Sequence, residues 1–138
     1  MSEQEQDKQQ IMAVIEQYRR GFATMDVEEL KAIWDQDYDR IIYIAQEMAQ
    51  PVLGWSGVEH YYQRVAGLLE RVKTMEVNDV SIDILGDSAF AFLSFHFEGE
   101  IKGRPHSADG RVTFLLHRTS GRWKVIHYHE SRPENLLS

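Results

Sequence analysis

The sequence contains no cysteine, and only 3 of its 138 residues are proline. Without cysteine the chain has no disulfide, no thiolate metal ligand and no cysteine nucleophile. Positive charge is also scarce, since 15 Lys and Arg stand against 22 Asp and Glu. The resulting net charge of −7 argues against a nucleic acid or an anionic membrane as partner, because few cations are left to neutralise phosphates. No apolar run approaches a membrane span, and the N-terminal segment is too polar and acidic for a secretory signal, so we expect a cytoplasmic protein.

The composition is that of a globular protein, with 43% hydrophobic and 11% aromatic residues. A chain of 138 residues is the size of one domain. Its acidic residues are unevenly placed: residues 1–85 hold 16 acidic and 8 basic residues, whereas residues 86–138 hold 6 and 7. Because Glu favours helices over strands, this division predicts a helical first part and a sheet in the second part.

Apolar residues recur every three or four positions in three segments, which predicts three amphipathic helices. The first begins at the capping pair Ser2 and Glu5 and ends near residue 24. The second opens at Asp26, and the third follows a similar capping signal at Ser56.

The strands are predicted from β-branched and aromatic residues and from a period of two that begins after Lys73. A short strand at residues 40–48 precedes the third helix. Four more follow it, over residues 77–85, 89–101, 110–118 and 122–131. The order helix, helix, strand, helix and four strands indicates an α+β domain. The mostly antiparallel sheet should curl around the helices as a cone with a cavity at its wide end.

The segments Gly103-Arg104-Pro105 and Arg111-Val112-Thr113 and the final strand, which reads G-x-W-x-x-x-H-x-H-x-S from Gly121 to Ser131, carry a family resemblance. The chain resembles the SnoaL-like branch of the nuclear transport factor 2-like superfamily, and also the association domain of calcium/calmodulin-dependent kinases. The resemblance implies one SnoaL-like domain over residues 1–138 with a cystatin-like cone, the fold of ketosteroid isomerase. It says less about function, because this fold serves isomerases, dehydratases, cyclases and oligomerisation modules.

Alternation divides the long strands into two faces, both largely apolar. We expect one face to line the cavity and the other to form a homodimer interface, since a monomer rarely leaves such a surface in water. The pocket arginines of the association domain would fall here at Ser94, Phe114 and Glu130, which assigns the face with these residues to the cavity. The opposite face, with Arg111, Thr113, Trp123, His127 and His129, would then be the dimer interface.

Because a hydroxyl, a phenyl ring and a carboxylate replace the arginines, we expect an apolar pocket for a small apolar or aromatic molecule. The predicted ligand-binding side chains are Tyr18, Trp34, Tyr43, Trp55, Tyr61, Phe92, Ser94 and Phe114. No phosphate-binding glycine loop, nucleotide fingerprint or Ser-His-Asp order is present, so no cofactor is expected.

The predicted catalytic residues are His96 with Glu98 or Glu130, and Tyr128. Burial raises the pKa of a carboxyl group in an apolar cavity, and a neighbouring His exchanges protons near neutral pH. Tyr128 or Tyr43 would donate a hydrogen bond to an enolate oxygen. These roles fit cofactor-independent isomerisation, dehydration or cyclisation. The alternative is a non-catalytic oligomerisation or ligand-sensing module, which is favoured if both glutamates point to solvent.

The spacing of His127 and His129 would also fit two ligands of a metal ion, with His117 as a third. The favoured interpretation is structural, with both histidines hydrogen-bonded in a covered sheet face beside Arg111 and Ser131. We therefore expect no metal site.

Overall fold

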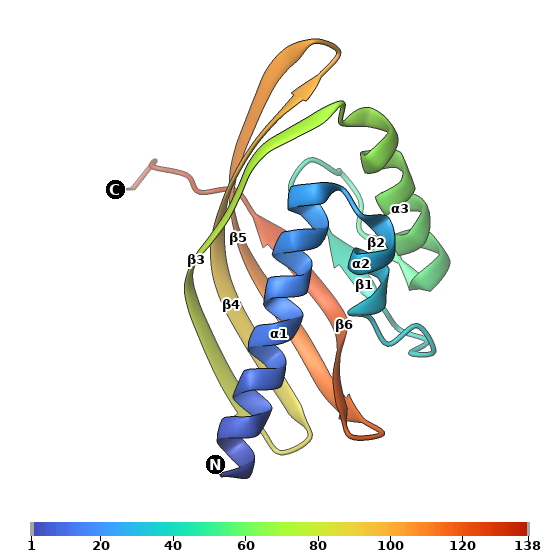
Figure 1. Ribbon diagram of the computed structural model, residues 1–138, viewed down its shortest axis with the longest axis vertical. Coiled ribbons are helices and arrows are strands. Elements are labelled where there is room, and N and C mark those ends of the chain that lie inside the picture. Colours follow the sequence, from blue (N-terminus) through green and yellow to red (C-terminus); the bar gives the residue numbers. More distant parts are fainter. Residues whose placement is uncertain (1, 138) are drawn as a thin grey trace.

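The computed structural model describes residues 2–137 and shows three helices and a single sheet (Figure 1). The elements are α1 (Glu3–Thr24), α2 (Val27–Ala32), β1 (Ile42–Ile44), β2 (Val52–Leu53), α3 (Gly54–Leu68), β3 (Arg71–Leu85), β4 (Ser88–Ile101), β5 (Arg104–Thr119) and β6 (Arg122–Ser131). The strand order is β2-β1-β6-β5-β4-β3, and every neighbouring pair is antiparallel except β1 and β6. The predicted α+β class, with helices first and a mostly antiparallel sheet, is confirmed.

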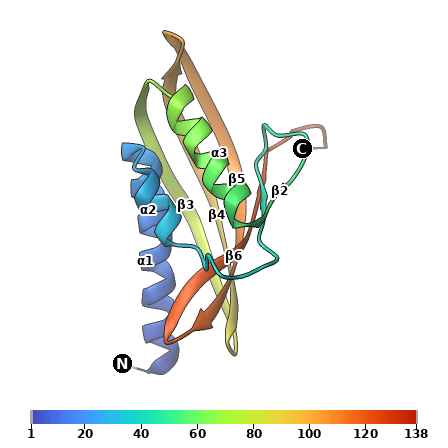
Figure 2. The ribbon, with the colours of Figure 1, turned by 90° about the vertical axis from the view of Figure 1, so that its right-hand side faces the viewer.

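The long strands β3, β4 and β5 curl, and the three helices lie on one side of the sheet (Figure 2). The helices bury their apolar stripes there, with Ile11, Ile15 and Tyr18 of α1 in the core. No helix within residues 2–137 is long and apolar enough to cross a membrane.

Two of the predicted helix starts are confirmed. The Ser2 hydroxyl accepts a hydrogen bond from the Glu5 N–H, and the Asp26 carboxylate accepts one from the Glu29 N–H. The third prediction, at Ser56, is wrong, because α3 begins at Gly54. Gly54 has a φ of 77°, a conformation that only glycine adopts without strain, so the chain turns sharply into the helix there.

The strand boundaries differ from the predicted ones where turns interrupt the apolar pattern. The strand expected over residues 40–48 is confined to Ile42–Ile44, and a turn-rich loop over residues 45–51 separates it from β2. Strands β3 and β5 begin earlier than predicted, at Arg71 and Arg104, and form with β4 a long antiparallel ribbon.

The end of the fold away from the cavity is fixed by a charged cluster around Asp7 of α1. The Asp7 carboxylate accepts hydrogen bonds from Trp123 Nε1 at 3.0 Å and from the Arg118 guanidinium at 3.0 and 3.1 Å. Arg118 also binds Asp87 at 2.8 Å. The cluster joins α1 to the β3–β4 turn and to the β5–β6 hairpin.

The predicted assignment of sheet faces is wrong for β4. Ala91 pairs with Phe114 and Leu93 pairs with Val112, so these odd-numbered residues of β4 share the inner face with even-numbered residues of β5. The even-numbered side chains of β4, expected in the cavity, therefore point outward.

A bulge in β6 corrects a second expectation. Leu115 pairs with His127 but Leu116 pairs with Val125, so Ile126 is an extra residue. Both Trp123 before the bulge and Tyr128 after it consequently face inward. Trp123, expected in the dimer interface, is only 4% exposed and belongs to the core.

Candidate functional site

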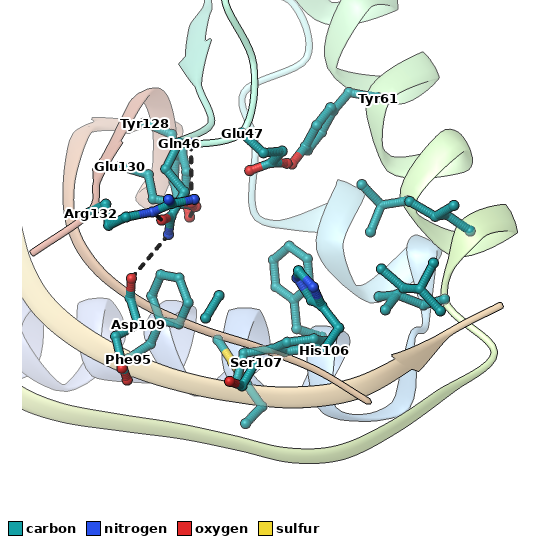
Figure 3. Close-up of a pocket in the computed structure, with 18 of the residues that line it drawn as sticks. Gln46, Glu47, Tyr61, Phe95, His106, Ser107, Asp109, Tyr128, Glu130 and Arg132 are labelled. Carbon is teal, nitrogen blue, oxygen red and sulfur yellow. Dashed lines mark hydrogen bonds between the residues drawn. The ribbon is translucent and has the colours of Figure 1, made fainter. Parts of the chain in front are cut away.

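A cavity of about 840 Å³ lies between α1, α3, the loop after β1 and the inner face of the sheet. Most of its wall is apolar or aromatic, from Phe22, Val65, Leu69, Met75, Phe95 and Phe97. One group of its polar residues lies near the ends of β1 and β6, where Glu130, Gln46 and Arg132 are close together, and His106 and Ser107 of β5 line another part of the wall (Figure 3).

Glu130 supplies a buried carboxylate to this cavity and is 9% exposed. Tyr128 donates its hydroxyl proton to Oε1 at 2.6 Å, and the main-chain N–H of Gln46 donates to Oε2 at 3.2 Å. Burial raises the pKa of Glu130, although both hydrogen bonds favour the charged form. No Lys, Arg or His within residues 2–137 forms a salt bridge with this carboxylate.

Three tyrosines surround the carboxylate. The hydroxyls of Tyr18 and Tyr128 are 3.0 Å apart, so Tyr18 extends the hydrogen-bond chain that ends at Glu130. The ring of Tyr43 stacks on that of Tyr128 with centroids 4.2 Å apart and planes 14° apart. The two residues are also register partners on parallel strands, so their side chains leave the sheet on the same face. Burial raises the pKa of all three phenols, which keeps them protonated.

Tyr43 differs from the other two because its hydroxyl makes no hydrogen bond to any described part of the chain. The side chain is 1% exposed and lines the cavity. Since no fully buried side-chain oxygen or nitrogen of residues 2–137 lacks a partner, this hydroxyl borders the open space of the cavity. It is placed to donate a hydrogen bond to a bound molecule.

The mouth of the cavity is bridged by the loop over residues 45–51. Tyr61 of α3 donates its hydroxyl proton to Glu47. The Gln46 side chain donates to the main-chain oxygen of Asp109 at 3.2 Å and accepts from Arg132 Nε at 3.0 Å. Figure 3 shows these side chains on the wall of the cavity.

The cavity brings together five of the predicted site residues, namely Tyr18, Tyr43, Tyr61, Tyr128 and Glu130. Phe114 lies on the predicted face but behind the wall, edge-on to the rings of Tyr18 and Tyr128. Trp34 is buried beside Tyr43 and donates its indole N–H to Tyr62. Trp55 is partly buried, and none of these three residues lines the cavity, so their expected place in its wall is wrong.

The expectation that Phe92, Ser94, His96 and Glu98 line the cavity is also wrong. All four lie on the outer face of β4. His96 is held between Asp109 Oδ1 at 2.7 Å and Glu98 Oε2 at 3.2 Å, and the hydrogen bonds to these carboxylates raise its pKa. Ser94 donates to Asp79 at 2.9 Å. The His96 and Glu98 pair therefore exists, but it faces away from the apolar cavity.

Several residues of the cavity were not predicted. Phe95 and Phe97 belong to the face of β4 that was assigned to the dimer. Gln46, Glu47 and Arg132 come from a loop and from the segment after β6, where no periodicity indicates which way a side chain points. For Phe95 and Phe97, the pairing of β4 with β5 across their hairpin was the sequence signal that could have placed them on the inner face.

The histidines on the outer face do not form a metal site with His117. The rings of His127 and His129 are 6.3 Å apart, whereas His117 binds Asp35 at 2.6 Å. Arg111 donates to the Ser131 hydroxyl at 3.1 Å rather than to either histidine. No group of three or more His, Asp or Glu residues within the described part of the chain is arranged to hold a metal ion.

Residues 11–134 match the SnoaL-like domain. Solved structures with the same fold include a candidate dehydratase of the nuclear transport factor 2-like family from Streptomyces avermitilis, with a TM-score of 0.82 and 17% identity over 94% of this chain and 99% of the other. A candidate aromatic ring hydroxylase from Novosphingobium aromaticivorans has a TM-score of 0.81 and 18% identity over 94% and 90% of the two chains.

The resemblance to kinase association domains is also found among solved structures. A candidate calcium/calmodulin-dependent protein kinase type II association domain from Thiobacillus denitrificans has a TM-score of 0.75 and 17% identity over 89% of this chain and 94% of the other. No curated protein matches the sequence. At these identities the structural matches establish the fold alone.

Proposed function

Because the chain belongs to the SnoaL-like domain family, whose match covers residues 11–134, we propose that it binds a small, largely apolar carbonyl compound and catalyses a cofactor-independent proton transfer on it. The observation that carries this proposal is a pair of buried side chains without the partners they need among residues 2–137. The Glu130 carboxylate has no cationic partner there, and the neighbouring Tyr43 phenol has no hydrogen-bond partner there. The name of the Streptomyces avermitilis structure, a candidate dehydratase, agrees with this class of reaction.

In the proposed reaction Glu130 is the base. Its carboxylate removes a proton from the carbon next to the ligand's carbonyl group, and the electrons of that C–H bond form the C=C bond of an enolate. Tyr43 donates a hydrogen bond to the oxygen on which negative charge develops. In a β,γ-unsaturated substrate the proton then returns to the γ carbon and the C=C bond moves into conjugation, which is isomerisation. In a β-hydroxy substrate the enolate electrons expel the hydroxide, which leaves with the proton as water, and this is dehydration.

Tyr128 has a different role, because its hydroxyl is already engaged with Glu130 and Tyr18. It holds the carboxylate in place and stabilises its charged form. His96 and Glu98 have no part in the proposed reaction, since they lie on the opposite face of the sheet. The raised pKa of Glu130 suits a base that must accept a proton near neutral pH.

Proton transfer can be tested without knowing the natural substrate. The probe is 2-tetralone, an apolar aromatic ketone, and its α-proton exchange in D₂O is followed by NMR. We expect the protein to accelerate exchange over buffer and Glu130→Gln to reduce the acceleration about 100-fold or more. Tyr43→Phe should reduce it about 10-fold or more. His96→Gln, which alters an acid–base group on the outer face, is the matched control and should exchange like the wild type.

Exchange at the buffer rate in the wild-type protein would reject the catalytic proposal. If 2-tetralone still saturates the protein and perturbs NMR signals of cavity residues, the ligand-sensing alternative is supported instead.

We further propose that the outer sheet face binds a second copy of the chain. An apolar row crosses four strands there, because Phe90, Leu115, His127 and Ile42 are successive register partners. Phe90 and Leu115 are 37% and 39% exposed. The β3 side of the row is acidic, whereas Arg111 and the histidines lie on the β5–β6 side. A two-fold axis that crosses the middle of the row parallel to the strands would therefore set the acidic side of each copy against the basic side of the other.

A further inference from the structure

Gln46 is bound to three separate parts of the cavity mouth. It lies two residues after the end of β1, and its main-chain N–H donates to Oε2 of Glu130. Its side-chain amide donates to the main-chain oxygen of Asp109 on β5, 3.2 Å away, and accepts from Arg132 Nε in the segment after β6, 3.0 Å away. Figure 3 shows Gln46 beside Glu130 and Arg132, with Asp109 across from it.

The hydrogen bond from Gln46 matters because Glu130 has few partners. Of its two oxygens, Oε1 accepts from Tyr128 and Oε2 accepts from Gln46. The other titratable groups around it are the carboxylate of Glu47 and four phenols, those of Tyr18, Tyr43, Tyr61 and Tyr62, and none of these can neutralise its charge. The Arg132 guanidinium is engaged by the Gln46 side chain instead.

The position of that main-chain N–H depends on the Gln46 side chain. The N–H belongs to the loop over residues 45–51, which is a turn-rich segment without regular structure. The two amide hydrogen bonds tie this loop to β5 and to the start of the segment after β6. Close packing also keeps the amide in place, because a Cβ added at Gly110 would come within 2.9 Å of Gln46 Nε2.

We propose that Gln46 is a positioning residue for Glu130: its side-chain amide fastens the loop across the cavity mouth, and the fastened loop presents a main-chain N–H that holds the carboxylate toward the ligand. The structural part of this inference stands without catalysis, whereas its effect on turnover rests on the proposed function. Gln46 itself does not touch the reacting atoms in this arrangement.

The test uses Gln46→Met, which keeps the side-chain length and removes both amide hydrogen bonds. Methionine still has a main-chain N–H that can donate to Glu130. The readout is the ¹³C NMR titration of the Glu130 carboxyl in the free protein, assigned by comparison with Glu130→Gln. Gln63→Met is the matched control, because Gln63 is exposed on α3 and away from the mouth. We expect the titration midpoint of Glu130 to move to higher pH in Gln46→Met and to stay unchanged in Gln63→Met. The main-chain hydrogen bond to the charged form is weakened, and the Gln46 amide, which also lowers the pKa of Glu130, is lost.

Arg132→Ala is a second variant that removes one anchor without changing the loop, and it should move the midpoint in the same direction by a smaller amount. A midpoint that stays at the wild-type value in both folded variants overturns the proposal. If Gln46→Met does not fold, the result with Arg132→Ala decides.

The same variants separate this inference from the proposed reaction. In the 2-tetralone assay, the pH at which exchange reaches half its maximum should rise in Gln46→Met together with the NMR midpoint. A moved midpoint in a protein that exchanges no protons would leave the positioning role intact and reject the proposed function. If the variants exchange protons but keep the wild-type midpoint of Glu130, the proposed function stands and the positioning role of Gln46 is rejected.

Discussion

At the scale of single residues, the cavity is governed by the cost of burying the Glu130 charge. Its carboxylate accepts two hydrogen bonds but has no cationic partner within residues 2–137. Burial therefore raises its pKa above 4.5, its ordinary value. A protein rarely keeps such a group for stability, because a buried charge without a partner disfavours folding.

Glu130→Gln should consequently stabilise the protein at neutral pH. With a raised pKa in the folded state, Glu130 contributes most to stability below about pH 4.5, and this contribution is lost as the pH rises through the folded-state pKa. Gln mimics the protonated form, and the hydroxyls of Tyr18 and Tyr128 can reverse their donor direction to bind it. We expect a gain of about 1 kcal/mol at pH 7.5 that shrinks toward zero near pH 4, measured by urea unfolding.

The control for this prediction is Glu134→Gln, the same chemical change at an exposed position after β6. It should leave the free energy of unfolding within about 0.5 kcal/mol of the wild type at both pH values. A Glu130→Gln protein that is less stable than the wild type at pH 7.5 would show that the charged carboxylate is a stabilising part of the fold.

At the scale of elements, the order and type of the helices and long strands could be predicted from sequence periodicity, because each element buries one stripe or one face. The prediction that His96 lines the cavity failed because the faces of β4 and β5 were matched incorrectly. Lys102 and Gly103 form a two-residue hairpin in which Ile101 pairs with Arg104. Any hairpin loop with an even number of residues places odd-numbered residues of one strand beside even-numbered residues of the next. This arithmetic was available in the sequence, whereas the bulge at Ile126 and the path of the loop over residues 45–51 were not.

The element contact most open to a stability test is the attachment of α1 to the sheet through Asp7. Its carboxylate is 11% exposed and binds both Trp123 and Arg118. Asp7→Ala would leave the indole N–H without its acceptor and remove a partner of the guanidinium, so we expect a loss of about 3 kcal/mol in the free energy of unfolding. Asp7→Asn keeps an acceptor for Trp123 and should lose roughly half as much.

Glu3→Ala provides the comparison, because Glu3 pairs with the same arginine at 3.6 Å but is 82% exposed. Exposed ion pairs contribute little, so the change should stay within about 0.5 kcal/mol. Equal losses for Asp7→Ala and Glu3→Ala in urea unfolding would mean that burial of the cluster is not what secures α1.

At the scale of the whole molecule, the two faces of the sheet divide the proposed roles. The inner face and the helices enclose the cavity, and the outer face carries the apolar row through Phe90, Leu115 and His127 that we assign to a second copy. Leu115→Glu should abolish the dimer, because a charge would be buried at the centre of the interface. The cavity lies on the other side of the sheet, so the exchange of 2-tetralone by this variant should persist if catalysis needs only one copy.

The dimer should also be sensitive to acid through His127. Partial burial and the neighbouring His129 lower the pKa of His127, so the fold favours its neutral form. A group of this kind stabilises the structure above its ordinary pKa of 6.5 and loses that contribution as the pH falls through the lowered value. A second copy would remove further solvent from His127 and increase the cost of charging it.

We therefore expect a dimer at pH 8 and dissociation toward the monomer at pH 5, measured by sedimentation, while His127→Gln remains dimeric at both. A wild-type mass that is the same at pH 5 and pH 8 would reject the role of His127, and a monomer at pH 8 would reject the dimer itself.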